Sequence, residues 1–201
     1  MLNLGKTTFE LERLFRQLNT LYFNDKLPRP IITVQSSGKR PAFGWCSNDK
    51  RWHENGKTPA YYEINISAEY LTRSDAEIVT TLLHEMVHLY CSVNGIKDTS
   101  RSGTYHNERY KAVAEAHGLI ITKNDKYGWH DSTLQESSVL DILKVNSQVF
   151  KVARQAAQTK TGGKKSSSRK YICPECGMTV RATKEVNIVC GDCQEPMTIE
   201  S

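Results

Sequence analysis

The chain has 201 residues, of which 38% are hydrophobic and 24% are charged, and its net charge is +5. This length fits one domain with its own core plus a small appendage, and it excludes two large domains. No stretch approaches the ~18–20 uninterrupted apolar residues of a membrane span, and residues 1–14 lack the apolar segment of a secretory signal. We therefore expect a cytoplasmic protein with no membrane partner.

The N-terminal part of the chain predicts one helix followed by a small sheet. Thr7 and Glu10 have capping-box spacing, and apolar residues then recur every three or four positions, so an amphipathic helix is expected to begin there. Pro28 and Pro30 end this helix. Short β-branched or alternating runs predict three strands, at residues 31–35, 42–46 and 62–66.

Three further helices are predicted along the chain. Ser74 and Glu77 form a second capping box, and the apolar face that follows reaches about Val93. A polar, turn-prone segment at 94–104 separates this helix from the next, which covers about 105–117 and stops at Gly118. A last helix is predicted at about 139–158.

The pattern His84-Glu85-Met86-Val87-His88 lies on the helix that follows Ser74. Residues four apart share a helix face, so His84 and His88 can bind one metal ion, and Glu85 can reach the water that this metal activates. A catalytic zinc takes about three protein ligands and leaves one position open. The sequence therefore predicts a catalytic Zn²⁺ bound by His84, His88 and a third ligand from elsewhere.

The candidates for the third ligand all lie downstream of this pattern. They are Asp98, His106, Glu108, Glu115 and His117. We favour His106, because it stands at the start of the next predicted helix, after a glycine-containing loop that can turn the chain back. His117 has a simpler interpretation, since a partly charged imidazole at a helix C-terminus complements the helix dipole.

A second metal site is predicted near the C-terminus. Two Cys-x-x-Cys pairs are separated by thirteen residues, the spacing of a zinc ribbon, and they comprise Cys173, Cys176, Cys190 and Cys193. Four thiolates complete a tetrahedral coordination, so this Zn²⁺ is predicted to be structural. Cys91 is predicted to be a buried packing thiol and no ligand.

A basic, Gly/Ser-rich stretch precedes the ribbon. Eight basic and no acidic residues fall between Lys144 and Lys170. We predict a domain at 1–158, a basic flexible linker at 159–170 and the ribbon at 171–201. The basic residues of linker and ribbon are predicted to contact DNA: Lys160, Lys164, Lys165, Arg169, Lys170, Arg181 and Lys184.

Several segments occur together in a distinctive order. They are LYFNDKLP at 21–28, INIS at 64–67, the two histidines around Glu85, His106-x-x-x-Tyr110 and the closing ribbon. In this combination the chain resembles the SprT-like family, which includes the Spartan-type DNA–protein crosslink proteases. The resemblance implies an α+β fold with a zincin-like metalloprotease core, in which a small sheet packs on helices, plus a small C-terminal zinc ribbon. It also implies that His106 is the third ligand and that substrates are held on DNA.

The predicted function is therefore zinc-dependent cleavage of DNA-associated or DNA-crosslinked proteins, with Glu85 as the general base. Single-stranded DNA is one possible form of the nucleic acid. The residue that stabilises the oxyanion stays open between Tyr61, Tyr127 and His130. Two alternatives remain: a DNA-binding regulatory module on a zincin scaffold, and a protease for a specific regulatory or foreign protein that the ribbon recognises.

Overall fold

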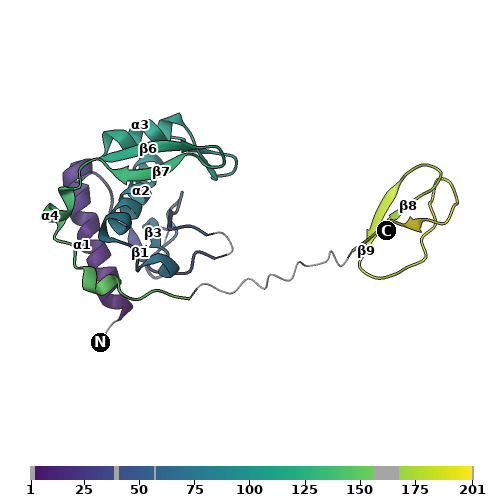
Figure 1. Ribbon diagram of the computed structural model, residues 1–201, viewed down its shortest axis with the longest axis horizontal. Coiled ribbons are helices and arrows are strands. Elements are labelled where there is room, and N and C mark those ends of the chain that lie inside the picture. The colour runs from purple at the N-terminus through teal and green to yellow at the C-terminus, as the bar shows by residue number, and fades with distance from the viewer. Residues whose placement is uncertain (1–2, 39–40, 57, 156–167, 201) are drawn as a thin grey trace. The chain divides into compact units, whose positions relative to one another are not determined.

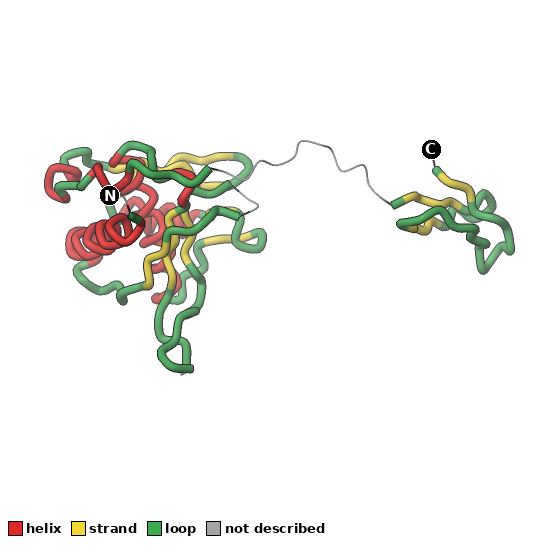
Figure 2. The backbone as a smooth tube through the Cα atoms, turned by 90° about the horizontal axis from the view of Figure 1, so that it is seen from below, coloured by secondary structure: helices red, strands yellow, loops and turns green. Residues whose placement is uncertain are grey.

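The computed structural model describes residues 3–38, 41–56, 58–155 and 168–200. The chain separates into two units, Met1–Ala156 and Ala157–Ser201. The first has a mixed α+β architecture, and in Figure 2 its helices gather on one side and its strands border them. None of the described helices has the length and apolar character needed to cross a membrane.

Helix α1, Leu4–Phe23, begins earlier than predicted. Its N-cap is Asn3, whose side chain accepts a hydrogen bond from Lys6 N. The predicted capping box at Thr7 and Glu10 is wrong, because the Thr7 hydroxyl donates to Val149 O instead. The helix ends at Asn24, which adopts a left-handed conformation with φ of 52°, so the chain leaves the helix before Pro28.

The first sheet confirms the three predicted strands. They are β1 (Ile31–Thr33), β2 (Gly44–Cys46) and β3 (Glu63–Ile66). The sheet order is β1-β3-β2. Strand β1 is parallel to β3, whereas β2 is antiparallel to it, with Gly44 opposite Ile66. Strand β2 therefore forms one edge of this sheet.

Helix α2, Asp75–Val93, lies between this sheet and a second one, and it follows a short 3₁₀ turn, η1 (Ala68–Tyr70) (Figure 1). Both bonds of the predicted capping box between Ser74 and Glu77 are present. The apolar side chains between and beside the histidines are fully buried, as predicted, at Leu82, Leu83, Met86 and Val87. Because both sheets pack against α2, this helix carries its side chains into the centre of the unit.

The second sheet was not predicted. It contains β4 (Thr99–Ser100), β5 (Tyr105–His106), β6 (Leu119–Asn124) and β7 (Gly128–Leu134), in the order β4-β5-β7-β6. The predicted helix at 105–117 is shorter: α3 covers Glu108–Ala116, and its N-cap is Asn107. His106 therefore lies on a strand and not at a helix start.

The closeness of β5 and β7 depends on Gly128. This residue has a φ of +74°, and a Cβ placed on it would lie 2.2 Å from His106 O. Any other residue would collide with the strand that carries His106, and would also be strained at this φ.

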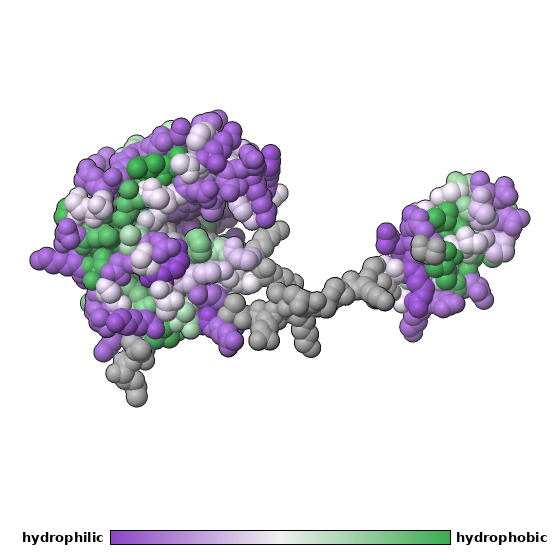
Figure 3. All heavy atoms as spheres, in the orientation of Figure 1, coloured by the Kyte–Doolittle hydropathy of each residue, from purple (hydrophilic) through white to green (hydrophobic). Residues whose placement is uncertain are grey.

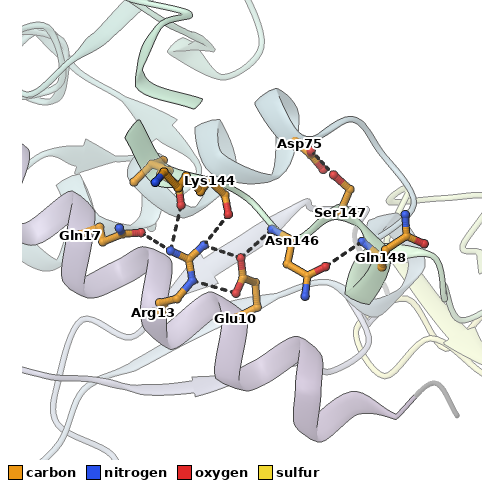
Figure 4. A network of polar contacts seen from close by, with 9 residues as sticks. Glu10, Arg13, Gln17, Asp75, Lys144, Asn146, Ser147 and Gln148 are labelled. Carbon is orange, nitrogen blue, oxygen red and sulfur yellow. Dashed lines mark hydrogen bonds and ion pairs between the residues drawn. The ribbon is translucent and has the colours of Figure 1, made fainter. Parts of the chain in front are cut away.

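The predicted helix at 139–158 is wrong. The chain forms a short α4 (Val139–Leu143), turns at Lys144 with φ of 46°, and continues as a 3₁₀ turn, η2 (Ser147–Phe150). Arg13 on α1 explains the interruption, since its guanidinium donates to Leu143 O and Lys144 O (Figure 4). Glu10 completes the network by accepting from Asn146 N and pairing with Arg13.

The second unit is a small antiparallel sheet. Its strands are β8 (Arg169–Ile172), β9 (Thr179–Ala182) and β10 (Thr198–Ile199), in the order β10-β8-β9. Strand β8 begins at Arg169, so the last two residues of the predicted linker belong to this sheet. Residues 159–167 of that linker lie outside the described residues. Among residues 168–200, the buried core consists of Tyr171, Cys173, Cys190 and Met197.

We expect the replacement Arg13→Met to lower the free energy of unfolding by about 2 kcal/mol, because buried Glu10 loses its partner and two carbonyls lose a donor. Urea denaturation measures this change. The control is Arg29→Met, which removes an exposed pair with Glu12 and should cost less than about 0.5 kcal/mol.

The pH dependence of the difference in unfolding free energy between the wild type and Arg13→Met provides a second test. Burial raises the pKa of Glu10, but hydrogen bonds from Arg13 and Asn146 and the charge of Arg13 outweigh it, and the pKa is lowered. The stabilisation is thus present above the unfolded-state pKa of ~4.3 and is lost as the pH falls through the lower folded-state pKa. A wild-type advantage that stayed constant down to about pH 2 would contradict this assignment.

Candidate metal centres

Three histidines from helix α2 and strand β5 come together. His84 and His88 come from α2, and His106 comes from β5. Their ring centroids form a nearly equilateral triangle with sides of 5.0, 5.1 and 5.0 Å. The Nε2 atoms of His88 and His106 are 3.0 Å apart, and one ligand atom from each of the three rings falls within a group 4.8 Å across.

The Nδ1 atom of each ring has a partner on another segment. His88 Nδ1 lies 2.5 Å from Asp98 Oδ2, and His106 Nδ1 lies 3.3 Å from Tyr127 O. His84 Nδ1 lies 2.9 Å from Ser132 Oγ, whose own proton is donated to His130 O. All three partners therefore accept, so each Nδ1 carries the proton and each Nε2 keeps its lone pair.

This arrangement fits a cation and not a hydrogen bond. Burial lowers the pKa of His84 well below its ordinary value, and burial together with the neighbouring His88 and His130 lowers that of His106 to about 3. The rings of His84 and His106 are therefore neutral. Two lone pairs at 3.0 Å repel each other unless a positive ion lies between them, and three imidazoles are a donor set that suits zinc.

Glu85 lies beside this group and beneath the edge of the first sheet. It is only 5% exposed, and burial raises its pKa to about 7, with smaller effects of His88, which lowers it, and of Asp98, which raises it. A Cβ placed on Gly44 would lie 3.1 Å from Glu85 Oε1 and 2.8 Å from Asn65 O. Glycine at this position therefore allows strand β2 to lie directly over the Glu85 carboxylate.

The structure separates the candidates for the third ligand. His106 joins His84 and His88, whereas Asp98 contacts the far nitrogen of His88. His117 stacks on Phe23 with ring centroids 4.5 Å apart and does not reach the group. Glu108 and Glu115 are exposed on α3.

The structure also distinguishes between the three candidates for oxyanion stabilisation. The ring of His130 lies 5.1 Å from that of His106 and 5.7 Å from that of His84. Tyr127 is 37% exposed, with its ring 5.3 Å from His130. Tyr61 instead donates its hydroxyl proton to Glu54 over 2.5 Å. His130 and Tyr127 therefore border the group of histidines, whereas the Tyr61 hydroxyl is used in its hydrogen bond to Glu54.

Sequence reasoning missed several residues that support the histidines. Tyr110 is fully buried, and its ring centroid lies 4.6–5.0 Å from those of all three histidines. Ser132 and the carbonyl of Tyr127 come from β7 and the turn before it. The four-residue spacing from His106 to Tyr110 was a usable signal, but the contacts made by β7 were not visible without the second sheet.

The second candidate centre lies in the small unit. The four predicted cysteines each offer a sulfur atom within a group 4.8 Å across, and the sulfurs of Cys176 and Cys190 are 3.7 Å apart. This separation is far longer than the ~2.05 Å of a disulfide and matches the edge of about 3.8 Å expected for a tetrahedron of thiolates around zinc. Hydrogen bonds from the backbone of Cys176 and Glu175 lower the pKa of Cys173 to about 7, which favours a thiolate.

The other two cysteines belong to neither group. Cys91 is fully buried in the hydrophobic core of the first unit. Burial raises its pKa to about 12, so it remains a thiol. Cys46 is partly buried on β2, and burial also raises its pKa.

The predicted DNA contacts have different surroundings. Lys160, Lys164 and Lys165 lie outside the described residues. Arg169, Arg181 and Lys184 are exposed. Lys170 pairs with Glu200 over 2.8 Å and stands directly opposite Arg181 in the sheet.

Comparison with known proteins identifies the family of this chain. The family model of the SprT-like family matches residues 11–126, which is more than half of the chain and includes the three histidines and Glu85. No curated protein and no solved structure matches the chain.

We expect Asp98→Ala to weaken zinc binding by the first unit about 10–100-fold, because His88 loses the partner that orients its ring and fixes its proton. Competition with a chelator measures the affinity. The matched control is Asp131→Ala, since Asp131 contacts His130, which is outside the group of three. Equal affinities for the Asp98 variant and the wild type would show that packing alone holds His88 in place.

Proposed function

We propose that this chain, which belongs to the SprT-like family, is a zinc-dependent endopeptidase that acts on proteins held on DNA. The observation that carries the proposal is the convergence of three imidazole lone pairs beside a buried glutamate whose pKa is raised to about 7. We take the first unit to be a zincin-like core, and the second to be a zinc ribbon.

The proposed reaction needs a group that moves a proton at neutral pH. Zinc bound by the three histidines would lower the pKa of water and polarise a peptide carbonyl. Glu85 would accept the proton of the attacking water and deliver it to the leaving nitrogen. Its pKa of about 7 suits both steps, because the carboxylate gains and releases a proton near working pH.

The substrate would bind along strand β2. This strand is an edge of its sheet, so the backbone groups on its outer side are free to pair with an extended peptide. Gly44 places that edge over Glu85, which would bring a peptide bond close to the carboxylate. We assign oxyanion stabilisation to His130, because its ring borders His84 and His106 and remains partly exposed.

The tail would hold the enzyme on DNA. The basic residues between 159 and 170 have no acidic neighbours in sequence, and Lys170 and Arg181 stand on the same face of the small sheet. These cations would neutralise phosphates without reading a sequence. Restricting enzyme and substrate to one strand would raise their effective concentration.

One observation favours a second candidate function, in which the ribbon recognises a protein. Residues 168–200 contain four basic and five acidic side chains, which is a weak basis for binding phosphates. Hydrophobic side chains are visible on this unit in Figure 3, and its exposed apolar residues are Met178, Val180, Val186, Val189 and Ile199. A protease directed to a specific protein would use such a surface.

We expect Glu85→Gln to reduce peptide cleavage by about 10²–10⁴-fold while zinc stays bound, because Glu85 moves protons and is not a ligand. Protein cleavage and metal content are measured on the same samples. The control is Glu77→Gln, an exposed residue at the start of the same helix, which keeps its capping role. Full zinc content with undiminished cleavage in the Glu85 variant would exclude this mechanism.

We expect removal of residues 159–201 to weaken DNA binding and to reduce bound zinc from two ions to one. Each lost phosphate contact should lower the magnitude of the negative slope of log K against log[salt] by about 0.7–0.9. Titration with labelled single- and double-stranded DNA at several salt concentrations measures this. Equal affinities and slopes for both chains would assign the tail to protein recognition, the second candidate function.

A further inference from the structure

An arginine next to the start of strand β2 forms no ion pair within the described residues. Arg73 precedes the N-cap of α2 and is half-buried. Its Nε donates to Tyr70 O over 3.1 Å, and its Nη2 donates to Thr81 Oγ1 over 2.9 Å. Within the described part of the chain, no carboxylate forms an ion pair with it.

Two independent contacts place Arg73 at the N-terminal end of strand β2. Its guanidinium carbon lies 4.0 Å from the ring centroid of Phe43, the residue directly before Gly44. Its hydrogen-bond partner Thr81 precedes Glu85 by one helical turn. A Cβ on Gly44 would lie 3.1 Å from both the Thr81 methyl group and Glu85 Oε1. Arg73 therefore borders the same stretch of β2 as the Glu85 carboxylate.

The guanidinium is held ready for a ligand. Stacking on Phe43 fixes its plane, and Tyr70 supports that ring edge-on with centroids 5.0 Å apart. Within the described residues, these two hydrogen bonds use two of its five N–H donors, so three remain, including both on Nη1. Phe43 itself is 49% exposed, so the stack is accessible from solvent.

The surroundings favour an anion over a neutral group. Burial lowers the pKa of Arg73, yet a guanidinium stays charged, so its charge is partly desolvated without an ion pair. The acidic residues nearby have other partners: the Glu77 carboxylate binds the backbone and hydroxyl of Ser74, and the Asp75 carboxylate accepts from the Ser147 hydroxyl. The planar fork of donors matches the planar oxygens of a carboxylate.

We propose that Arg73 is a specificity-determining residue that binds an Asp or Glu side chain of the substrate close to the scissile bond, at the Phe43 end of strand β2. This inference rests on the proposed endopeptidase function and names its substrate class. A chain-terminal carboxylate has the same chemistry, so the experiment includes both sources.

The test uses the full-length zinc-bound protein and C-terminally amidated peptides that differ only in Glu, Gln or Lys beside the cleaved bond. The wild type should cleave the Glu peptide about tenfold more efficiently, in kcat/KM, than the Gln peptide. Arg73→Gln should abolish this preference, and Arg73→Glu should shift it toward Lys. Arg29→Gln removes the same charge from the pair with Glu12 and should keep the preference.

A second readout separates this inference from the proposed function. Binding of the same peptides, and of a Gln peptide with a free C-terminal carboxylate, to the Glu85→Gln protein is measured by fluorescence anisotropy. It should show the preference for the Glu side chain and its loss with Arg73→Gln. If none of the peptides is cleaved, the proposed endopeptidase function is rejected. The binding measurement still tests whether Arg73 recognises a carboxylate. Equal binding of the Glu and Gln peptides would overturn the inference, and so would a preference only for a Gln peptide with a free C-terminal carboxylate.

Discussion

Three imidazole lone pairs have to meet at one point, and the arrangement of the first unit follows from this requirement. His84 and His88 share one face of α2, but His106 comes from β5, so the second sheet has to dock against the helix. The 3.0 Å between two Nε2 atoms is unfavourable without a cation. Packing must therefore supply the energy that holds them together, and α2 is accordingly apolar and buried along most of its length.

Two glycines allow both sheets to come this close. At Gly128 a side chain would collide with the carbonyl of His106, and at Gly44 it would collide with Asn65 O and the Glu85 carboxylate. The first glycine sets the position of a proposed metal ligand, and the second sets the distance between the proposed base and the proposed peptide-binding edge. Neither glycine is a ligand, yet each decides where a reactive group lies.

Local signals explain why the sequence predicts some parts of this site and misses others. Helix α2 contains its own capping box and apolar face, so its bounds and its two histidines could be predicted. The helix after Val139 could not, because the residue that interrupts it, Arg13, is 130 positions away from Leu143. Strand β7 supplies Ser132 and follows Tyr127, but it pairs with β5 through a single long-range residue pair, His106 opposite Gly128. The three histidines that come together were thus predictable, and the partners of their Nδ1 atoms were not.

The two centres differ in how they depend on folding. The histidines lie beside a core of more than twenty buried side chains, so packing can position them before a metal arrives, at the cost of holding lone pairs together. Two of the four cysteines make up half of a four-residue core, which is too small to offset the conformational entropy of their unit. Under the proposed function, zinc would supply most of the folding free energy of that unit. A chelator would then remove the proposed chemistry of the first unit and the structure of the second.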